Sequence, residues 1–251
     1  MKKLILISAI FTLMGCNNSE KKQSEPIHAN ETVLIVNYQL ENMSLEEHAE
    51  LGSAVAPSFV SENVPGLLGK SFIGDVGRGV FGGIYYFENS KSVSVYLESE
   101  LWKDVVAHPN LVEFKTDVFK TFNGTELANG EHSSRKTSSD QTDAENLHVL
   151  VVNYTYTKAP SDEEMSSQIK EYAPVFSNEN FPGMIGKTMI NNTEEKVYGG
   201  VYYFTSRDAI ENYFQSDLWK GFEGDENTDV YKKDIYGVAP ISTISNGVPI
   251  L

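Results

Sequence analysis

The chain has 251 residues and a formal net charge of −15 at pH 7, with 35 acidic against 20 basic side chains. An acidic protein repels phosphate backbones, so the composition argues against nucleic-acid binding. The single cysteine, Cys16, excludes an intrachain disulfide, a Cys-ligated metal cluster and a cysteine nucleophile in the mature domain. The five histidines form no HxH or HxxxH pair, and we therefore expect neither a metal site nor a bound cofactor.

Residues 1–15 have the pattern of a secretion signal. Two lysines precede an apolar run, Leu4–Leu13, that is too short for a permanent membrane-spanning helix. The run ends at Leu13-Met14-Gly15-Cys16, which resembles the bacterial lipobox. In that family the cysteine is acylated and becomes the first residue of the mature protein. The alternative is an ordinary cleaved signal that happens to carry a cysteine nearby.

A lipid anchor on Cys16 sets the expected location of the protein. Residues 16–30, rich in Ser, Glu, Lys and Gln, are predicted to form a flexible tether. Anionic lipids do not attract an acidic domain, so palmitate-type acyl chains must hold the protein at the membrane. Two or more such chains are sufficient for stable anchoring. We expect a lipoprotein of the bacterial cell envelope, anchored to a membrane, with its folded part outside the cytoplasm.

An internal repeat determines the predicted architecture. With a shift of 117 residues, Ala56–Lys103 aligns with Ala173–Lys220 without a gap, with 21 identities in 48 positions. Upstream, Val33–Tyr38 matches Val149–Tyr154 at a shift of 116. The period fits a small domain rather than a solenoid repeat. We therefore predict two units, 31–122 and 147–251 with a C-terminal tail, joined by a polar linker over 123–146.

The expected elements follow the same order in both units. Val33–Leu40 is a β-branched run of strand length. A helix follows, because Ser44 with Glu47 and Ser161 with Glu164 have the spacing of capping boxes. In the second unit the helix places one apolar face inward, and prolines near its end predict that it kinks or stops there. The face consists of Met165, Ile169, Tyr172 and Phe176, and the prolines are Pro57 and Pro174.

Each unit then continues with two strands, a helix and a last strand. Pro-Gly turns open the second strand, and the third strand ends in Tyr-Tyr-Phe. Apolar residues at helical spacing predict a single second helix: Val93, Tyr96, Leu97 and Leu101, and equivalently Ile210, Tyr213, Phe214 and Leu218. Val112–Phe122 and Val230–Val238 are the predicted fourth strands.

The order β-α-β-β-α-β is the ferredoxin-like arrangement, an α+β fold in which both helices cover one face of a four-stranded sheet. The other face needs cover, and the second unit can supply it. We expect two tandem ferredoxin-like units that form an intramolecular version of a dimeric α+β barrel. The soluble domain should then be a pseudo-dimeric monomer.

Three motifs shared by both units resemble motifs of the YdhR-like family, which belongs to the dimeric α+β barrel superfamily. They are the Pro-Gly-x-x-Gly-Lys strand at 65–70 and 182–187, the Gly-Gly-(Ile/Val)-Tyr-Tyr-Phe strand at 82–87 and 199–204, and the Tyr-containing helix that follows. Members of the family usually carry one copy per chain and dimerise. The superfamily includes cofactor-free monooxygenases that act on phenolic or quinol substrates, and the resemblance implies such an activity here.

Cofactor-free oxygenation needs an apolar pocket and a few hydrogen-bond donors. Asn37 and Asn153 are candidate catalytic residues, since each is a lone amide in an apolar first strand and related oxygenases use an asparagine there. Such an amide can equally form hydrogen bonds with polar groups at the end of a strand. Trp102 and Trp219 share one position and are further catalytic candidates, because the indole could orient a substrate, although it could also anchor the core.

Substrate-binding candidates lie on the second and third strands. Tyr85 and Tyr202 each have a tyrosine neighbour on the opposite face of the strand, and the sequence leaves open which one faces the helices. Lys70 and Lys187 could stabilise a phenolate or simply extend to solvent. Two functions stay open: an oxygenase for a small aromatic substrate, and a non-catalytic lipoprotein that binds a small apolar ligand or a partner protein.

Overall fold

The computed structural model describes residues 31–121, 146–172 and 175–242. The predicted signal, Cys16, the tether and all but the last residue of the linker lie outside these ranges. The first unit contains β1 (Thr32–Leu40), α1 (Leu45–Val55), a 3-10 turn (Ala56–Ser58), β2 (Leu67–Asp75), β3 (Val80–Phe87), α2 (Ser90–Glu98), α3 (Glu100–Val106) and β4 (Leu111–Thr121). The second contains β5 (His148–Tyr156), α4 (Asp162–Tyr172), β6 (Met184–Asn192), β7 (Val197–Phe204), α5 (Arg207–Phe214), α6 (Asp217–Glu223) and β8 (Thr228–Val238).

The predicted start of the first helix is confirmed in both units. The Ser44 backbone N–H donates to Glu47 Oε2 at 2.8 Å, and the Glu47 N–H donates back to Ser44 Oγ at 3.2 Å. Ser161 and Glu164 repeat this pair at 2.8 and 3.3 Å. These contacts satisfy backbone donors that the first helical turn would otherwise leave unpaired.

The predicted single second helix is wrong, because the structure divides it into two short helices in each unit. In the first unit α2 ends and α3 begins at Ser99, whose backbone is extended (φ −69°, ψ 156°). The Ser99 side chain accepts a hydrogen bond from the Trp102 backbone N–H at 3.2 Å. Ser216 caps α6 in the same way, with the Trp219 N–H at 3.2 Å. A serine that caps a new helix thus interrupts a continuous apolar pattern.

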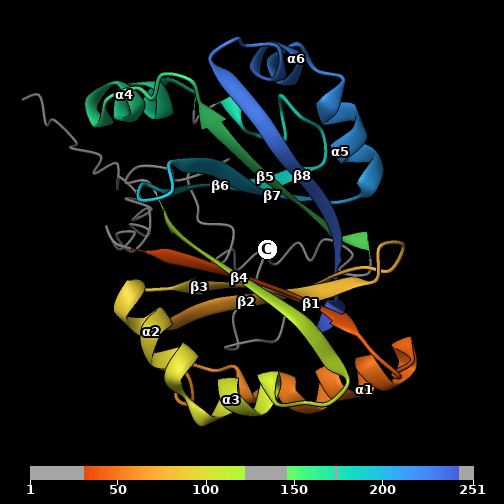
Figure 1. Cartoon of the computed structure of the whole chain (residues 1–251). Helices are drawn as coiled ribbons and strands as arrows, with labels where there is room; N and C mark the ends of the chain where they lie inside the picture. The colour runs from red at the N-terminus through yellow and green to blue at the C-terminus, as the bar shows by residue number, and fades with distance from the viewer. Residues whose placement is uncertain (1–30, 122–145, 173–174, 243–251) are drawn as a thin grey trace, which may run out of the picture.

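The eight strands form one closed antiparallel barrel in the order β1-β3-β2-β8-β5-β7-β6-β4. Two short junctions join the units: β2 pairs with β8 through Ile73–Val238 and Gly74–Gly237, and β4 pairs with β6 through Lys120–Asn191 and Thr121–Ile190. Helices α1 to α3 cover one outer side of the barrel and α4 to α6 the opposite side (Figure 1). The predicted pair of facing ferredoxin-like units is confirmed.

Strand alternation separates the core into an inner part and two outer parts. Along β1, Val33 and Ile35 face the second unit inside the barrel, whereas Leu34 and Val36 face the helices of their own unit. The same alternation places Tyr86 and Tyr203 inside and Tyr85 and Tyr202 under the helices. Each unit therefore has its own apolar core between sheet and helices, separate from the core that the units share.

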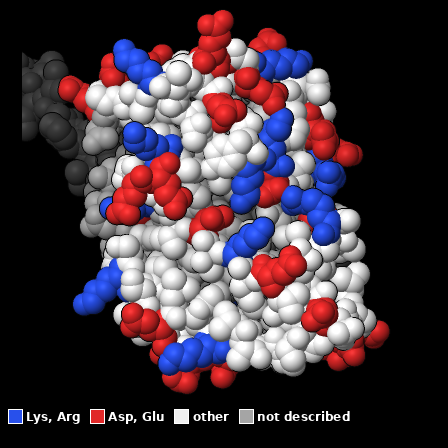
Figure 2. All heavy atoms as spheres, in the orientation of Figure 1, with Lys and Arg blue, Asp and Glu red and all other residues white. Residues whose placement is uncertain are grey.

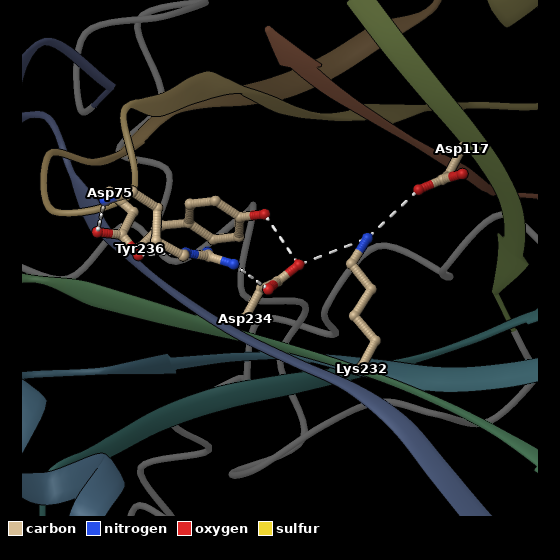
Figure 3. Close-up of polar contacts among 6 residues, drawn as sticks. Asp75, Asp117, Lys232, Asp234 and Tyr236 are labelled. Atoms are coloured by element: carbon tan, nitrogen blue, oxygen red, sulfur yellow. Dashed lines mark hydrogen bonds and ion pairs between the residues drawn. The ribbon is translucent and has the colours of Figure 1, made fainter. Parts of the chain in front are cut away.

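An ion-pair network lies between the sheets of the two units and links them (Figure 3). Arg78, which follows β2, contacts Asp75 and Asp234 at 2.5 Å each. Lys232 lies 3.6 Å from Asp234 and 3.5 Å from Asp117 of β4, while the Tyr236 hydroxyl donates to Asp234 at 3.2 Å. The network joins both edges of the first sheet to β8 of the second unit.

On the surface, acidic and basic side chains are interspersed over the face that Figure 2 shows. None of the helices in the described part of the chain combines the length and the apolar character needed to cross a membrane.

Candidate functional site

A cavity of about 750 Å³ lies in the first unit, between the outer face of its sheet and helices α1 and α3. This volume suits a small organic ligand. Most of the lining is aromatic or aliphatic, and the exposed side chain of Asp104 marks a side that opens to solvent. The lining of the cavity includes Tyr38, His48, Gly52, Val55, Phe59, Lys70, Phe72, Phe81, Tyr85, Leu101 and Val105, together with residues 237–241 of the second unit.

Lys70 contributes an amine to the wall of this cavity. Its Nζ lies 3.1 Å from the centroid of the Phe59 ring, 3.8 Å from Phe72 and 4.5 Å from Tyr85. The residue is only 3% exposed, and no carboxylate of the described residues lies within ion-pair distance of it. It does not extend to solvent, so that possibility is wrong, while stabilisation of a phenolate by Lys70 stays a prediction.

The position of Lys70 follows from the register of β2. Lys70 pairs with Tyr85 of β3, and both side chains point toward the helices. Burial lowers the pKa of the Lys70 amine well below its usual range, because the charged form loses its hydration. The neutral amine is therefore more accessible to Lys70 than to a solvent-exposed lysine. The surrounding ring faces can stabilise the ammonium that forms when this amine accepts a proton.

His48 and Tyr38 form a second polar group in the wall. The Tyr38 hydroxyl and His48 Nε2 lie 2.8 Å apart, and either can donate, depending on the imidazole tautomer. The imidazole also lies 4.7 Å from the Phe81 ring, centroid to centroid. Burial lowers the pKa of His48 and raises that of Tyr38, so both groups are held neutral near pH 7. The pair can exchange or relay a proton without carrying a permanent charge.

Tyr85 gives the cavity a phenolic hydroxyl. The Tyr96 hydroxyl of α2 donates to Tyr85 Oη at 3.4 Å, and the two rings lie 5.4 Å apart. Burial raises the pKa of both phenols, that of Tyr96 to about 12. Tyr85 therefore stays protonated and can donate a hydrogen bond to an anionic oxygen in the cavity. Its predicted role in binding is compatible with this position.

The candidate asparagines lie on the other face of the sheet. Asn37 and Asn153 continue the barrel-facing series of β1 and β5, and Asn37 is not among the residues that line the cavity. The Oδ1 atoms of both are buried without a hydrogen-bond partner in the described structure. Their predicted catalytic role is not tested by this arrangement. The cavity is built from other groups.

The two tryptophans lie in the helical layer. Trp102 packs against Tyr96 and Phe114 at ring distances of 5.6 and 5.9 Å, and it does not line the cavity. Trp219 is 2% exposed, and its indole N–H donates to Glu223 Oε2 at 3.1 Å. Both positions suit an anchor of the packing between helices and sheet. Their predicted catalytic role stays a prediction.

The second unit repeats the buried lysine. Lys187 Nζ lies 3.5 Å from the Phe176 ring and 4.6 Å from Tyr202, and burial again lowers its pKa well below the usual range. Tyr202 is the equivalent of Tyr85 and is also buried. The predicted substrate-binding groups are thus arranged alike in both units.

The predicted site lacked His48, Tyr38, Gly52 and Phe59. A signal for two of them is present in the sequence: His48 and Gly52 occupy positions where the second unit has Met165 and Ile169 on an otherwise apolar helical face. A polar residue and a glycine on that face indicate a space next to the helix. Tyr38 and Phe59 have aromatic equivalents and give no such signal. Within the described ranges, no group of three or more His, Cys, Asp or Glu is placed to hold a metal ion.

The fold and the cavity together define a class of protein, the α+β barrels built from two ferredoxin-like units with an apolar site between sheet and helices. The model of one family, described as "Putative mono-oxygenase ydhR", matches residues 33–131 and again residues 149–247. The two matches cover most of the chain, which therefore belongs to this family. No curated protein matches it.

Solved structures share the fold at low sequence identity. A "putative monooxygenase" from Fusobacterium nucleatum has a TM-score of 0.57 at 11% identity, covering 84% of this chain and 92% of that one. One from Lactobacillus acidophilus has a TM-score of 0.53 at 13% identity, covering 84% and 93%. An "anthrone oxidase-like protein" has a TM-score of 0.54 at 10% identity, covering 85% and 93%. These similarities establish the common fold.

Proposed function

We propose that this protein is a cofactor-free monooxygenase for a small phenol- or quinol-type aromatic molecule, which binds in the cavity of the first unit. The observation that carries the proposal is the Lys70 amine, held against three aromatic rings in a cavity of about 750 Å³. A buried amine without a carboxylate partner favours a ligand that brings a negative charge or releases a proton. A phenol does both.

Cofactor-free oxygenation requires only a few groups of the protein. The substrate hydroxyl transfers its proton to Lys70, and the ammonium and phenolate form an ion pair between aromatic walls. The phenolate, an electron-rich ring, gives an electron to O₂, and the phenoxyl radical and superoxide then recombine to form a C–O bond. The resulting peroxide anion takes the proton back from the Lys70 ammonium and becomes a ring hydroperoxide. Loss of water, with the hydrogen of the same ring carbon, leaves a quinone, so one oxygen atom enters the product and the other leaves as water. All four electrons that reduce O₂ come from the substrate.

Neutral hydrogen-bond donors in the wall support the same reaction. Tyr85 stays protonated and can donate to the phenolate oxygen, while the His48–Tyr38 pair can accept or return a proton elsewhere on the substrate. The apolar surroundings strengthen such interactions, because little water competes for them. Membership of the ydhR family and the fold shared with monooxygenase-like proteins support an oxygenase over other activities that a ferredoxin-like unit can host.

Oxygen consumption tests this proposal. The full chain in detergent is supplied with a panel of quinols and naphthols, and uptake is measured against buffer. We expect uptake with at least one substrate and a loss of about 10²-fold or more in Lys70→Met. Lys187→Met is the matched control, with the same substitution in the second unit, and Asn37→Ala with Asn153→Ala tests the asparagines. Binding without uptake would favour the non-catalytic, ligand-binding lipoprotein.

We also propose that the protein is held at a bacterial envelope membrane by acyl chains on Cys16, with its folded part outside the cytoplasm. The support lies in the sequence, where the positive start, the short apolar run and the lipobox-like motif agree. Metabolic labelling with an alkyne-tagged palmitate should mark the wild type in the membrane fraction. Cys16→Ala should lose the label, and a label that persists in this variant would contradict the anchor.

A further inference from the structure

The two units align residue by residue in their helices, which makes their differences informative. Helix α1 (Leu45–Val55) corresponds to α4 (Asp162–Tyr172), and α3 (Glu100–Val106) corresponds to α6 (Asp217–Glu223), each at a shift of 117. On the face of α1 that lines the cavity, His48, Gly52 and Val55 stand where α4 has Met165, Ile169 and Tyr172. On α3, Val105 stands where α6 has Phe222.

The first helix packs differently in the two units. Helix α1 has no buried residue, whereas Met165 and Ile169 of α4 are only 6% and 3% exposed. A β-carbon built on Gly52 would meet no atom within 4 Å. The space next to α1 is thus open at the position where α4 carries a buried isoleucine side chain.

Helix α3 also has a smaller side chain in the cavity wall than α6 has at the equivalent position. Val105 lines the cavity of the first unit. Its equivalent, Phe222, packs its ring 4.9 Å from Tyr154 and 5.7 Å from Trp219, measured between centroids. Tyr154 is the equivalent of Tyr38, which in the first unit faces the cavity, contacts His48 and has Phe114 of β4 as its phenyl neighbour at 5.3 Å. The second unit therefore carries a phenyl ring on its last helix at a position where the first unit has only the small side chain of Val105.

The second unit also contributes to the site of the first. Residues 237–241, at and beyond the end of β8, form part of the cavity wall. The Ala239 N–H donates to the Phe72 carbonyl at 2.9 Å, and the Phe72 N–H donates to Ser242 Oγ at 2.7 Å. This segment is held against β2 and covers the edge of the cavity.

We infer that this chain holds one ligand site, in its first unit, and that Gly52 and Val105 create it, while Ile169 and Phe222 close the equivalent space in the second unit. The second unit then acts as a scaffold: it covers the open face of the first sheet and completes the cavity wall with residues 237–241. The inference rests on the proposed function only for the aromatic character of the ligand.

The experiment compares filling variants of the first unit with a matched control. Gly52→Ile and Val105→Phe transfer the side chains of the second unit, and Gly221→Ile makes the same glycine-to-isoleucine change on α6, where a β-carbon also meets no atom within 4 Å. Titration calorimetry of the full chain with 1-naphthol should give one site per chain. We expect at least a tenfold loss of affinity in each filling variant and no change in Gly221→Ile. Unchanged affinity in Gly52→Ile and Val105→Phe, or two sites per wild-type chain, would overturn the inference.

Crystals pressurised with xenon test the cavity without a substrate, since xenon enters apolar cavities. We expect xenon between α1 and the sheet of the first unit in the wild type, and none there in the combined Gly52→Ile, Val105→Phe variant. Xenon at the equivalent place in the second unit, with none in the first, would contradict the inference. Absence of oxygen uptake would count against the proposed function alone, because neither readout depends on turnover. Thermal unfolding of each variant confirms that it is folded.

Discussion

Lys70 Nζ lies 3.1 Å from the centroid of the Phe59 ring, in the wall of an apolar cavity, with no carboxylate of the described residues within ion-pair distance. A buried amine loses hydration that ring faces replace only in part. The protein keeps this arrangement in both units, since Lys187 packs on Phe176 in the same way. In the first unit, where the amine also lines a cavity, such a costly position is typical of a group retained for chemistry or ligand binding.

The first prediction is that Lys70→Met stabilises the fold at pH 7. The pKa of Lys70 is lower in the folded than in the unfolded chain, so between these two pKa values the unfolded chain binds a proton that the folded chain does not. Stability is therefore lost as the pH falls from about 10.5, by about 1.4 kcal/mol for each unit of pKa difference. Urea unfolding at pH 7 and 9.5 should show a gain from Lys70→Met that shrinks at the higher pH.

Lys187→Met should behave alike, because its amine is equally buried and its pKa is lowered for the same reason. A gain that is equal at the two pH values in both variants would contradict the lowered pKa.

The second prediction concerns the titration of His48. Burial lowers its pKa below the usual 6.5, so the folded protein holds the imidazole neutral while the unfolded chain takes up a proton. The contribution of His48 to stability is thus complete above pH 6.5 and declines as the pH falls below it. The nitrogen-15 shifts of the imidazole, followed by NMR, should report a midpoint below 6.5, and a midpoint above it would rule this out.

The third prediction tests the hydrogen bond between Tyr38 and His48. Tyr38→Phe removes a hydroxyl 2.8 Å from Nε2 and should cost about 1 kcal/mol of stability. The imidazole nitrogen loses its partner, so the tautomer balance seen in the nitrogen-15 shifts should change as well. Tyr154→Phe is the matched variant in the second unit, where Met165 stands at the position equivalent to His48. This variant should leave the His48 signals unaltered.

The fourth prediction concerns a buried contact between the units. Ser71 Oγ of β2 and Tyr203 Oη of β7 lie 2.9 Å apart inside the barrel. Tyr203→Phe should cost about 1 kcal/mol or more, because it leaves a buried polar group short of a partner. A double-mutant cycle with Ser71→Ala should show coupling of about 0.5 kcal/mol or more in urea unfolding. Strictly additive losses would show that the two hydroxyls do not interact.

The fifth prediction concerns the ion pairs of Figure 3. Arg78 contacts Asp234 across the junction of the units, but its side chain is 45% exposed. Solvent screens such pairs, so Arg78→Met should cost no more than about 1 kcal/mol, and less at high salt. The affinity of the cavity for 1-naphthol should not change, since Arg78 does not line it. A loss that is independent of salt would indicate that packing of the arginine, rather than its charge, matters.

Much of the architecture can be read from the sequence, because the features that determine it are local or repeated. The capping boxes at Ser44 and Ser161, the strand runs and the repeat at a shift of 117 each appear as short patterns. They suffice for two ferredoxin-like units, and the open face of each sheet then requires a facing partner. The division of the second helix at Ser99 was missed, since apolar spacing continues across a serine that starts a new helix.

The site depended on relations that sequence patterns do not contain. Which tyrosine of each pair faces the helices, and that Lys70 is buried rather than extended to solvent, follow from the register of β2 against β3 and from the packing of α1. The cavity itself arises from missing atoms at Gly52 and a small side chain at Val105, whose effect depends on what lies across from them. The sequence alone determined the repeat, the fold class and the candidate lysines, because these rest on short-range order along the chain. Only the tertiary structure decided which face each group occupies and where the cavity of the first unit lies, because both depend on contacts between segments far apart in sequence.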